Sequence, residues 1–374
     1  MGLTLMEGNE AVARGAVAAG CRFFAGYPIT PATPIFNAML QLLPPMGGIC
    51  IQGEDEIASI GACLGAAMTG VKVMTATSGP GISLYSEHIS FAVGSEIPLV
   101  VVDVQRLGPS TGSATKGADG DIQFMRWGSS GGLPVIVLAP TDVADCFTLT
   151  MTAFNLAETY RCPVFLASNK EVAQTRESVD FDALERPAVV DRRPADQHEG
   201  VFRPFAVTDS RMVPDFLPIG HHIPVRQTSS THGADGYITT DPGEIAAFQQ
   251  RLMDKLTTAV DSFSYHRFHP AAGSDTLVIT YGVTARTARD ALGHTAAGPP
   301  TAALLELQTL WPVPETLLRT TARSFKRVVV AEMNLGQYVH EVRRVLGSQP
   351  VSFLGRMDGQ LITPEQIERT ASHG

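Results

Sequence analysis

Alternation is the feature of this sequence that most constrains its fold: short apolar runs alternate with segments of helical periodicity along most of the chain. In the first half we expect strands at 22–25, 49–52, 71–77, 97–104, 135–138 and 164–166, and helices at 8–20, 33–43, 56–68, 82–93 and 141–159. Thr141-Asp142 is the expected N-cap of the last helix, since short polar side chains accept hydrogen bonds from first-turn amides. Strands and helices that alternate at these lengths predict an α/β fold with a parallel sheet.

The periodic pattern weakens after residue 176 and returns near residue 271. Prolines interrupt the stretch between, as in Arg192-Arg-Pro194. The second periodic part predicts strands at 276–280, 301–307, 327–331 and 351–354, with helices at 285–292, 314–324 and 336–346. Because 374 residues exceed what one hydrophobic core usually organises, we expect two α/β domains, 1–175 and 271–374, joined by an extended connecting region at 176–270.

Charge and cysteine content exclude several classes of function. A net charge of -9 disfavours nucleic acid as the main partner, because phosphate binding needs a basic face. The cysteines contain no C-x-x-C pair, which excludes a local iron–sulfur or zinc site, and we expect no metal ligands in this chain. The pattern predicts reduced, buried thiols in a cytoplasmic protein without a signal peptide or membrane span. These cysteines are Cys21, Cys50, Cys63, Cys146 and Cys162.

Polar and glycine-rich segments follow four of the predicted strands. They are residues 27–30, residues 54–56, residues 77–81 and Arg106. Ligands of open parallel sheets bind beyond the carboxyl ends of the strands, where such loops converge. We therefore expect all four segments to face one crevice.

Glu56 opens a helix of small residues, and Gly65 follows it after eight intervening residues. This spacing resembles the signature of the pyrimidine-binding domain of thiamine-diphosphate enzymes. In those enzymes the glutamate hydrogen-bonds N1′ of the aminopyrimidine, a task that needs a carboxyl group able to exchange a proton with a ring nitrogen. The alternative is an acidic residue that stabilises the first helical turn through the helix dipole.

A strand followed by Thr77-Ser-Gly-Pro-Gly81 lies twenty-one residues after Glu56. The same turn occurs at the equivalent place in many thiamine-diphosphate enzymes, and its glycines allow the backbone to come close to a ligand. An ordinary strand-to-helix turn is the alternative. A nucleotide loop is excluded, since the chain has neither a Gly-Lys pair nor G-x-G-x-x-G.

Further motifs resemble the alpha subunits of 2-oxoacid:ferredoxin oxidoreductases over nearly the whole chain. Residues 26–34 contain the Y-P-I-T-P element, and residues 104–112 resemble the family's arginine-bearing loop. Leu310-Trp-Pro-Val-Pro314 and Glu332-Met-Asn-Leu-Gly-Gln337 resemble its second domain. The resemblance implies that residues 1–175 form a thiamine-diphosphate pyrimidine-binding domain and that residues 271–374 form a transketolase-C-like domain.

The resemblance also implies roles for particular residues. Glu56 is the proton-exchanging glutamate, Thr30 places its hydroxyl near the 2-oxoacid, and Arg106 grips the 1-carboxylate with its planar guanidinium. The alternative for Thr30 is a turn residue between two prolines, and the alternative for Arg106 is a surface ion pair. The expected cofactor-binding residues are Tyr27, Pro28, Ile29, Glu56, Thr77, Ser78, Gly79, Pro80 and Gly81.

Two elements of such an enzyme are missing from the sequence. There is no Gly-Asp-Gly segment for magnesium and diphosphate, and the nearest approximation, Asp119-Gly-Asp121, corresponds to a substrate-side loop in the family. The resemblance therefore implies a beta subunit that carries Mg²⁺, diphosphate and a [4Fe-4S] cluster, in an α2β2 assembly. The implied reaction decarboxylates a 2-oxoacid, passes two electrons to ferredoxin and transfers the acyl group to coenzyme A.

The overall pattern is most like subunits that act on 2-oxoglutarate, with pyruvate and branched-chain 2-oxoacids as alternatives. Lys116 is a candidate for binding a distal carboxylate, although an exposed lysine in a glycine-rich loop explains it equally well. A two-subunit thiamine-diphosphate decarboxylase without redox chemistry is another alternative. A catalytically inert scaffold subunit is a third, against which the combination of Glu56, Thr30 and Arg106 argues.

Overall fold

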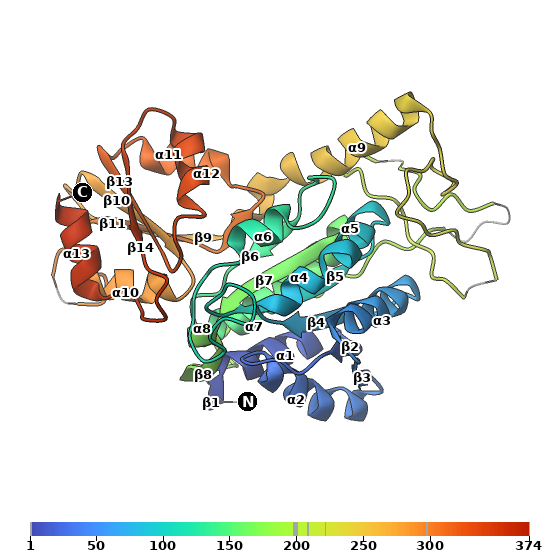
Figure 1. Cartoon of the computed structure of the whole chain (residues 1–374), viewed down its shortest axis with the longest axis horizontal. Helices are drawn as coiled ribbons and strands as arrows, with labels where there is room; N and C mark the ends of the chain where they lie inside the picture. The colour runs from blue at the N-terminus through green and yellow to red at the C-terminus, as the bar shows by residue number, and fades with distance from the viewer. Residues whose placement is uncertain (1, 197–200, 208, 221, 297, 374) are drawn as a thin grey trace.

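The computed structural model describes residues 2–196, 201–207, 209–220, 222–296 and 298–373. Figure 1 shows two α/β units, with the second to one side of the first, and a long irregular segment at the opposite end. The strands form one sheet in each unit and a separate two-stranded ribbon. The expected α/β architecture is confirmed.

The first unit is built on a seven-stranded sheet with the order β12-β6-β7-β5-β4-β2-β3. Neighbouring strands from β3 to β6 pair in parallel. The central strands β5 and β7 are buried along their whole length, which explains why most of their residues are apolar. The strands are β2 (Phe23–Gly26), β3 (Ile49–Gln52), β4 (Val73–Thr77), β5 (Leu99–Gln105), β6 (Ile136–Leu138), β7 (Pro163–Asn169) and β12 (Thr309–Trp311).

Helices cover both faces of this sheet and bury two hydrophobic cores against it. Asp142 caps the longest helix, as predicted, by accepting a hydrogen bond of 2.8 Å from the amide of Asp145. One face carries α1 (Gly8–Ala18), α2 (Thr33–Leu42) and α7 (Val143–Tyr160), and the other α3 (Glu56–Met68), α4 (Pro80–Leu84), α5 (Ser86–Gly94) and α6 (Ile122–Trp127). The short helices η1 (Pro44–Met46) and α8 (Lys170–Gln174) lie in connections of this unit.

The second unit has a five-stranded sheet with the order β14-β13-β10-β11-β9, parallel except for β9. Its carboxyl edge lies toward the first unit, because Met333, directly after β13, accepts a backbone hydrogen bond of 2.8 Å from Asp119. Its strands are β9 (His266–His269), β10 (Thr276–Tyr281), β11 (Ala303–Leu307), β13 (Arg327–Glu332) and β14 (Val351–Gly355), and its helices α10 (Val283–Ala291), α11 (Glu315–Ala322), α12 (Val339–Leu346) and α13 (Pro364–His373).

The connecting region contains more regular structure than the sequence pattern predicts. It begins with β8 (Arg176–Asp180), which pairs with β1 (Leu3–Glu7), and it ends with α9 (Pro242–Thr257) and η2 (Val260–Phe263). Ion pairs fasten α9 to the first unit: buried Glu96 accepts hydrogen bonds of 2.6 Å from Arg251 and 2.9 Å from Lys255. Burial alone would raise the pKa of Glu96, but these two cations lower it to about 2.

Three further features differ from the expectations. Strand β12, from a stretch that resembles the second domain, pairs antiparallel with β6 and adds an antiparallel edge to the first sheet. The helix expected at 82–93 is two helices, because the chain turns at buried Tyr85, whose hydroxyl lies 2.8 Å from Thr75 Oγ1. Helices α6 and α13 were not expected at all. The domain bounds 1–175, 176–270 and 271–374 stay a prediction.

Within the described parts of the chain, no helix combines the length and apolar character needed to cross a bilayer.

Candidate active site

The four segments singled out in the sequence follow four neighbouring parallel strands. Strands β3, β2, β4 and β5 are adjacent in that order, and they end at Gln52, Gly26, Thr77 and Gln105. The carboxyl ends of parallel strands lie at one edge of a sheet, so the segments after them meet there. The four segments therefore lie at one edge of the sheet, and that they face one crevice stays a prediction.

The Y-P-I-T-P loop is joined directly to the arginine loop. Arg106 Nη1 donates a hydrogen bond of 2.6 Å to the backbone carbonyl of Thr30. On its other side this loop is anchored by buried Asn9 of α1, whose Nδ2 donates to the carbonyl of Pro31 at 3.0 Å. Tyr27 and Thr30 are exposed while Ile29 packs against the core, so the loop presents polar groups outward from a fixed base.

Glu56 lies against the Thr77–Gly81 turn. Its side chain is 6% exposed, in the first turn of α3. A Cβ atom added to Gly81 would lie 2.8 Å from Glu56 Oε1 and 1.9 Å from Thr77 Oγ1. Only glycine therefore fits at position 81, and the small residue lets the carboxylate reach the turn.

Gly79 has a comparable role beside the arginine. Its φ of 50° belongs to the left-handed region, and an added Cβ would lie 3.1 Å from Arg106 Nε. Pro80 then takes the first position of α4, where its fixed φ is favourable. The two glycines thus place Glu56 and Arg106 against one short turn.

Several buried polar atoms at this turn have no hydrogen-bond partner among the described residues. They are Thr77 Oγ1, Ser78 Oγ and Arg106 Nε. An unsatisfied buried donor or acceptor costs about 1–3 kcal/mol, so three of them at one place favour a bound polar ligand. A carboxylate, two hydroxyls and a turn with two glycines fit the aminopyrimidine of thiamine diphosphate.

Asp119 and Asp121, noted in the sequence as Asp119-Gly-Asp121, form a group with a third carboxylate, Asp103, that no motif revealed, and Asp121 acts on Arg106. Asp103 is fully buried in β5, and burial together with Asp121 raises its pKa well above the usual range. Burial raises the pKa of Asp121 to about 6 and that of Asp119 to about 7. Burial lowers the pKa of Arg106, while Asp121 and Glu56 oppose that shift. The available signal was a charged residue inside the apolar run of residues 99–105.

Lys116 lies apart from these residues. It is exposed, and its aliphatic stem lies against the loop after β14, where an added Cβ on Gly359 would be 3.0 Å from Lys116 Cβ. Its backbone carbonyl accepts a hydrogen bond of 2.8 Å from Leu107, so the residue belongs to the same loop as Arg106. The structure therefore places Lys116 at the surface, where the arginine loop of the first unit meets the loop after β14 of the second.

Among the residues with described positions, no group of three or more histidine, cysteine, aspartate or glutamate side chains is arranged to hold a metal ion. All the cysteines are free, and Cys50 alone is not fully buried.

Comparison with known proteins places the chain in a family. Residues 14–278 match the family described as pyruvate flavodoxin/ferredoxin oxidoreductase, thiamine diphosphate-binding, and residues 274–367 match pyruvate:ferredoxin oxidoreductase core domain II. The fold expected from the resemblance is thereby confirmed. The fold is also shared with an inactive tetramer of a split-gene transketolase, with a TM-score of 0.57 and 15% identity.

Full-length relatives agree with this assignment. A 2-oxoglutarate synthase subunit KorA of Methanothermobacter marburgensis is 41% identical, covering 97% of this chain and 96% of the relative. A ketoisovalerate oxidoreductase subunit VorB of Methanothermobacter thermautotrophicus is 33% identical over 97% of this chain and 95% of the relative. The solved 2-oxoglutarate:ferredoxin oxidoreductase of Magnetococcus marinus, with 2-oxoglutarate, coenzyme A and succinyl-CoA bound, has a TM-score of 0.92 and 33% identity, over 99% of this chain and 65% of that chain. The chain belongs to the pyruvate flavodoxin/ferredoxin oxidoreductase family.

Proposed function

We propose that this chain is the alpha subunit of a 2-oxoglutarate:ferredoxin oxidoreductase, which converts 2-oxoglutarate and coenzyme A to succinyl-CoA and CO2 and reduces ferredoxin. The observation that carries the proposal is that Glu56 and Arg106 lie against one turn with unpaired buried polar atoms, while Arg106 also holds the carbonyl of Thr30. Thiamine diphosphate, when bound, supplies the carbon nucleophile and the electron sink.

The residues of the chain then have distinct tasks. Glu56 would hydrogen-bond the ring nitrogen of the pyrimidine and hold the proton exchanged with it, and the turn at 77–81 would let the ring come close to the backbone. Arg106 binds the carboxylate next to the 2-oxo group with its guanidinium, of which Nη1 also holds the carbonyl of Thr30. Thr30 is proposed to bind the same substrate through its hydroxyl.

The site is completed by a second chain. In our proposal, a beta subunit holds the diphosphate and Mg²⁺ and carries a [4Fe-4S] cluster that passes electrons to ferredoxin. Two copies of each subunit form the α2β2 assembly. The sequence motif for magnesium and diphosphate is absent from this chain, which supports a divided site.

The substrate assignment is supported by the relatives. Four archaeal relatives of 39–41% identity are named as 2-oxoglutarate synthase subunits. The two ketoisovalerate oxidoreductase subunits have 32–33% identity. Branched-chain 2-oxoacids are therefore the second candidate substrates.

The test is to purify the chain together with its co-purifying subunit and to measure electron transfer to ferredoxin. The substrates are 2-oxoglutarate, pyruvate and 2-oxoisovalerate. We expect kcat/KM to be highest for 2-oxoglutarate and turnover to depend on coenzyme A, thiamine diphosphate and Mg²⁺. A complex without iron–sulfur absorbance that still decarboxylates would support the non-redox alternative. Preference for pyruvate or 2-oxoisovalerate would overturn the assignment of the substrate.

Lys116→Ala tests whether this lysine binds the distal carboxylate of 2-oxoglutarate. An exposed lysine contact contributes about 1 kcal/mol, so we expect KM for 2-oxoglutarate to rise about fivefold while KM for pyruvate changes little. Lys170→Ala is the control, because that lysine is paired with Glu171 on α8. Equal losses for both substrates in the Lys116 variant would remove Lys116 from the specificity pocket.

A further inference from the structure

The segment at residues 332–337 has no task in the proposed reaction, although it resembles a motif of the family. It follows β13 at the carboxyl edge of the second sheet. Buried Glu332 holds it in shape by accepting hydrogen bonds from Tyr281 Oη at 2.7 Å and from the amides of Tyr338 and Val339 at 3.0 Å each. Asn334 also donates to Glu332, at 3.0 Å. The segment is therefore a rigid platform.

The platform contacts the first unit at residues 119–123, which we call the substrate-side segment. Asp119 bonds to it through both backbone groups: its amide donates to Met333 at 2.8 Å and its carbonyl accepts from Asn334 Nδ2 at 2.8 Å. Gln337 adds side-chain bonds, donating to the carbonyl of Gly120 at 2.5 Å and accepting from the amide of Gln123 at 2.9 Å. Gln123 Nε2 returns a bond of 2.9 Å to the Gln337 carbonyl.

The substrate-side segment is also tied to the arginine loop. The amide of Asp121 donates to Gln105 Oε1 at 3.0 Å, and Gln105 directly precedes Arg106. The charge of Asp121 acts on Arg106 and that of Arg106 on Asp121. A displacement of residues 119–123 would thus change the surroundings of the group that binds the substrate carboxylate.

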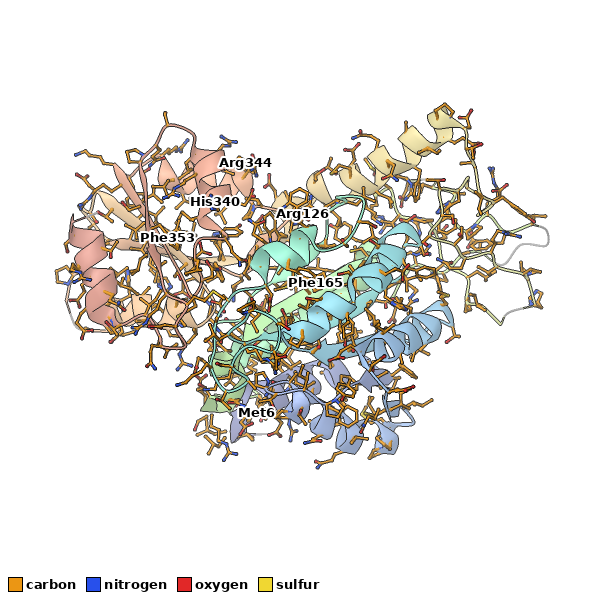
Figure 2. All side chains as sticks on the ribbon, in the orientation of Figure 1. Met6, Arg126, Phe165, His340, Arg344 and Phe353 are labelled. Carbon is orange, nitrogen blue, oxygen red and sulfur yellow. The ribbon has the colours of Figure 1, made fainter. Side chains whose placement is uncertain are left out.

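Helix α6 continues this contact between the units. Figure 2 shows Arg126 of α6 and Arg344 and His340 of α12 in the same region of the molecule. Arg126 and Arg344 line one surface groove together with Glu341. The contact made by Gln337 therefore lies in an extended junction between the units, so a single substitution at Gln337 leaves the rest of that junction in place.

We propose that Gln337 is a positioning residue of the second unit, which together with Gln123 holds the substrate-side segment and its Asp121 in place, so that Arg106 is positioned to bind the 2-oxoacid. This inference rests on the proposed function and deepens it, because it assigns control of substrate binding to the unit that carries neither Glu56 nor Arg106. Glutamine suits the task, since its side-chain amide combines a donor NH2 group with an acceptor oxygen and both are used across the junction.

The test compares Gln337→Ala and Gln123→Ala with Gln349→Ala in the complete enzyme. Gln349 is a matched control: it donates two hydrogen bonds to Ala322 and Phe325, inside the second unit and away from the substrate-side segment. For each of the first two variants we expect KM for the 2-oxoacid to rise about tenfold and kcat to stay within about twofold of wild type. The reason is that a slightly misplaced Arg106 binds the substrate carboxylate less well. The KM for thiamine diphosphate should be unchanged.

A second measurement follows the segment itself. Hydrogen–deuterium exchange of peptides covering residues 117–126 should be faster in the Gln337 and Gln123 variants and unchanged in the Gln349 variant. Because both residues serve one contact, the double variant should raise KM no more than about twofold beyond either single variant. Additive losses would overturn the proposal, and so would faster exchange with an unchanged KM. Unchanged exchange would show that Gln337 does not hold the segment.

Failure of the proposed function would be recognised separately. The quantity compared is the KM of each variant divided by the KM of wild type. Both are measured with whichever 2-oxoacid the wild-type complex oxidises. A wild-type enzyme that prefers another 2-oxoacid would contradict the assignment of 2-oxoglutarate. The ratio for Gln337→Ala would still support or overturn the positioning role, since every 2-oxoacid carries the carboxylate that Arg106 binds.

Discussion

Replacement of Glu56 by glutamine should lower kcat of the complete enzyme by roughly a hundredfold or more, as the loss of general acid–base catalysis typically does. The substitution keeps the shape of the side chain and its place beside Gly81, where the carboxylate is packed with little room. It removes the group that can exchange a proton with the pyrimidine. We therefore expect the enzyme to assemble, to bind thiamine diphosphate and to lose turnover.

Glu54→Gln is the matched control for this experiment. Glu54 is two residues away and exposed, whereas Glu56 is buried against the turn at 77–81. Turnover of the Glu54 variant should be close to wild type. Wild-type turnover in Glu56→Gln, with a loss in Glu54→Gln instead, would mean that the proton-exchanging glutamate was assigned to the wrong residue.

Arg106→Ala should reduce kcat/KM for every 2-oxoacid by a similar factor. The 1-carboxylate is common to all of these substrates, and loss of its buried charge partner costs on the order of 2–5 kcal/mol, or about thirtyfold to several thousandfold. The effect should include a rise in KM, because Arg106 binds the substrate before the reaction. Steady-state kinetics with 2-oxoglutarate and pyruvate measure it.

Two variants separate substrate binding from the structural contact that Arg106 makes with Thr30. Arg106→Lys keeps a positive charge but loses the planar fork, so it should recover only part of the affinity. Arg22→Ala is the control for loss of a partly buried arginine, since Arg22 bonds to the carbonyl of Cys21 before β2, at the opposite edge of the sheet. A loss confined to one substrate would contradict a role for Arg106 on the shared carboxylate.

Local patterns in the sequence predicted most of the first unit correctly. Strand Ile49–Gln52 and helix Glu56–Met68 have the predicted bounds, because an apolar run and a run of small residues each end at polar residues. Helix α9 escaped prediction although Asp241 caps it by accepting a hydrogen bond from Glu244. Its polar composition and the irregular chain before it obscured the signal. Strand β12 has three residues and is defined by pairing with distant β6, so no local pattern could reveal it.

The site was predictable where a motif carries the chemistry and unpredictable where tertiary contacts do. Motifs singled out Glu56 and Arg106, and their meeting at one turn follows because the loops after parallel strands converge at one edge; their roles stay predictions. Asp103 and Asp121 approach each other only in the folded chain, and the pKa shift of Asp103 arises from burial and from that approach. The bonds of Gln337 span more than two hundred residues, so its role follows from the structure alone.

The measurement that tests the central claim most directly is CO2 release from 2-oxoglutarate by this chain alone, by its partner subunit alone and by the two together. All three samples receive thiamine diphosphate, Mg²⁺, coenzyme A and ferredoxin, and circular dichroism verifies that each chain is folded. If this chain supplies the pyrimidine and substrate side of a divided site, only the mixture should turn over, and Glu56→Gln should lower its activity by roughly a hundredfold or more. Sustained CO2 release by this chain alone would contradict the account.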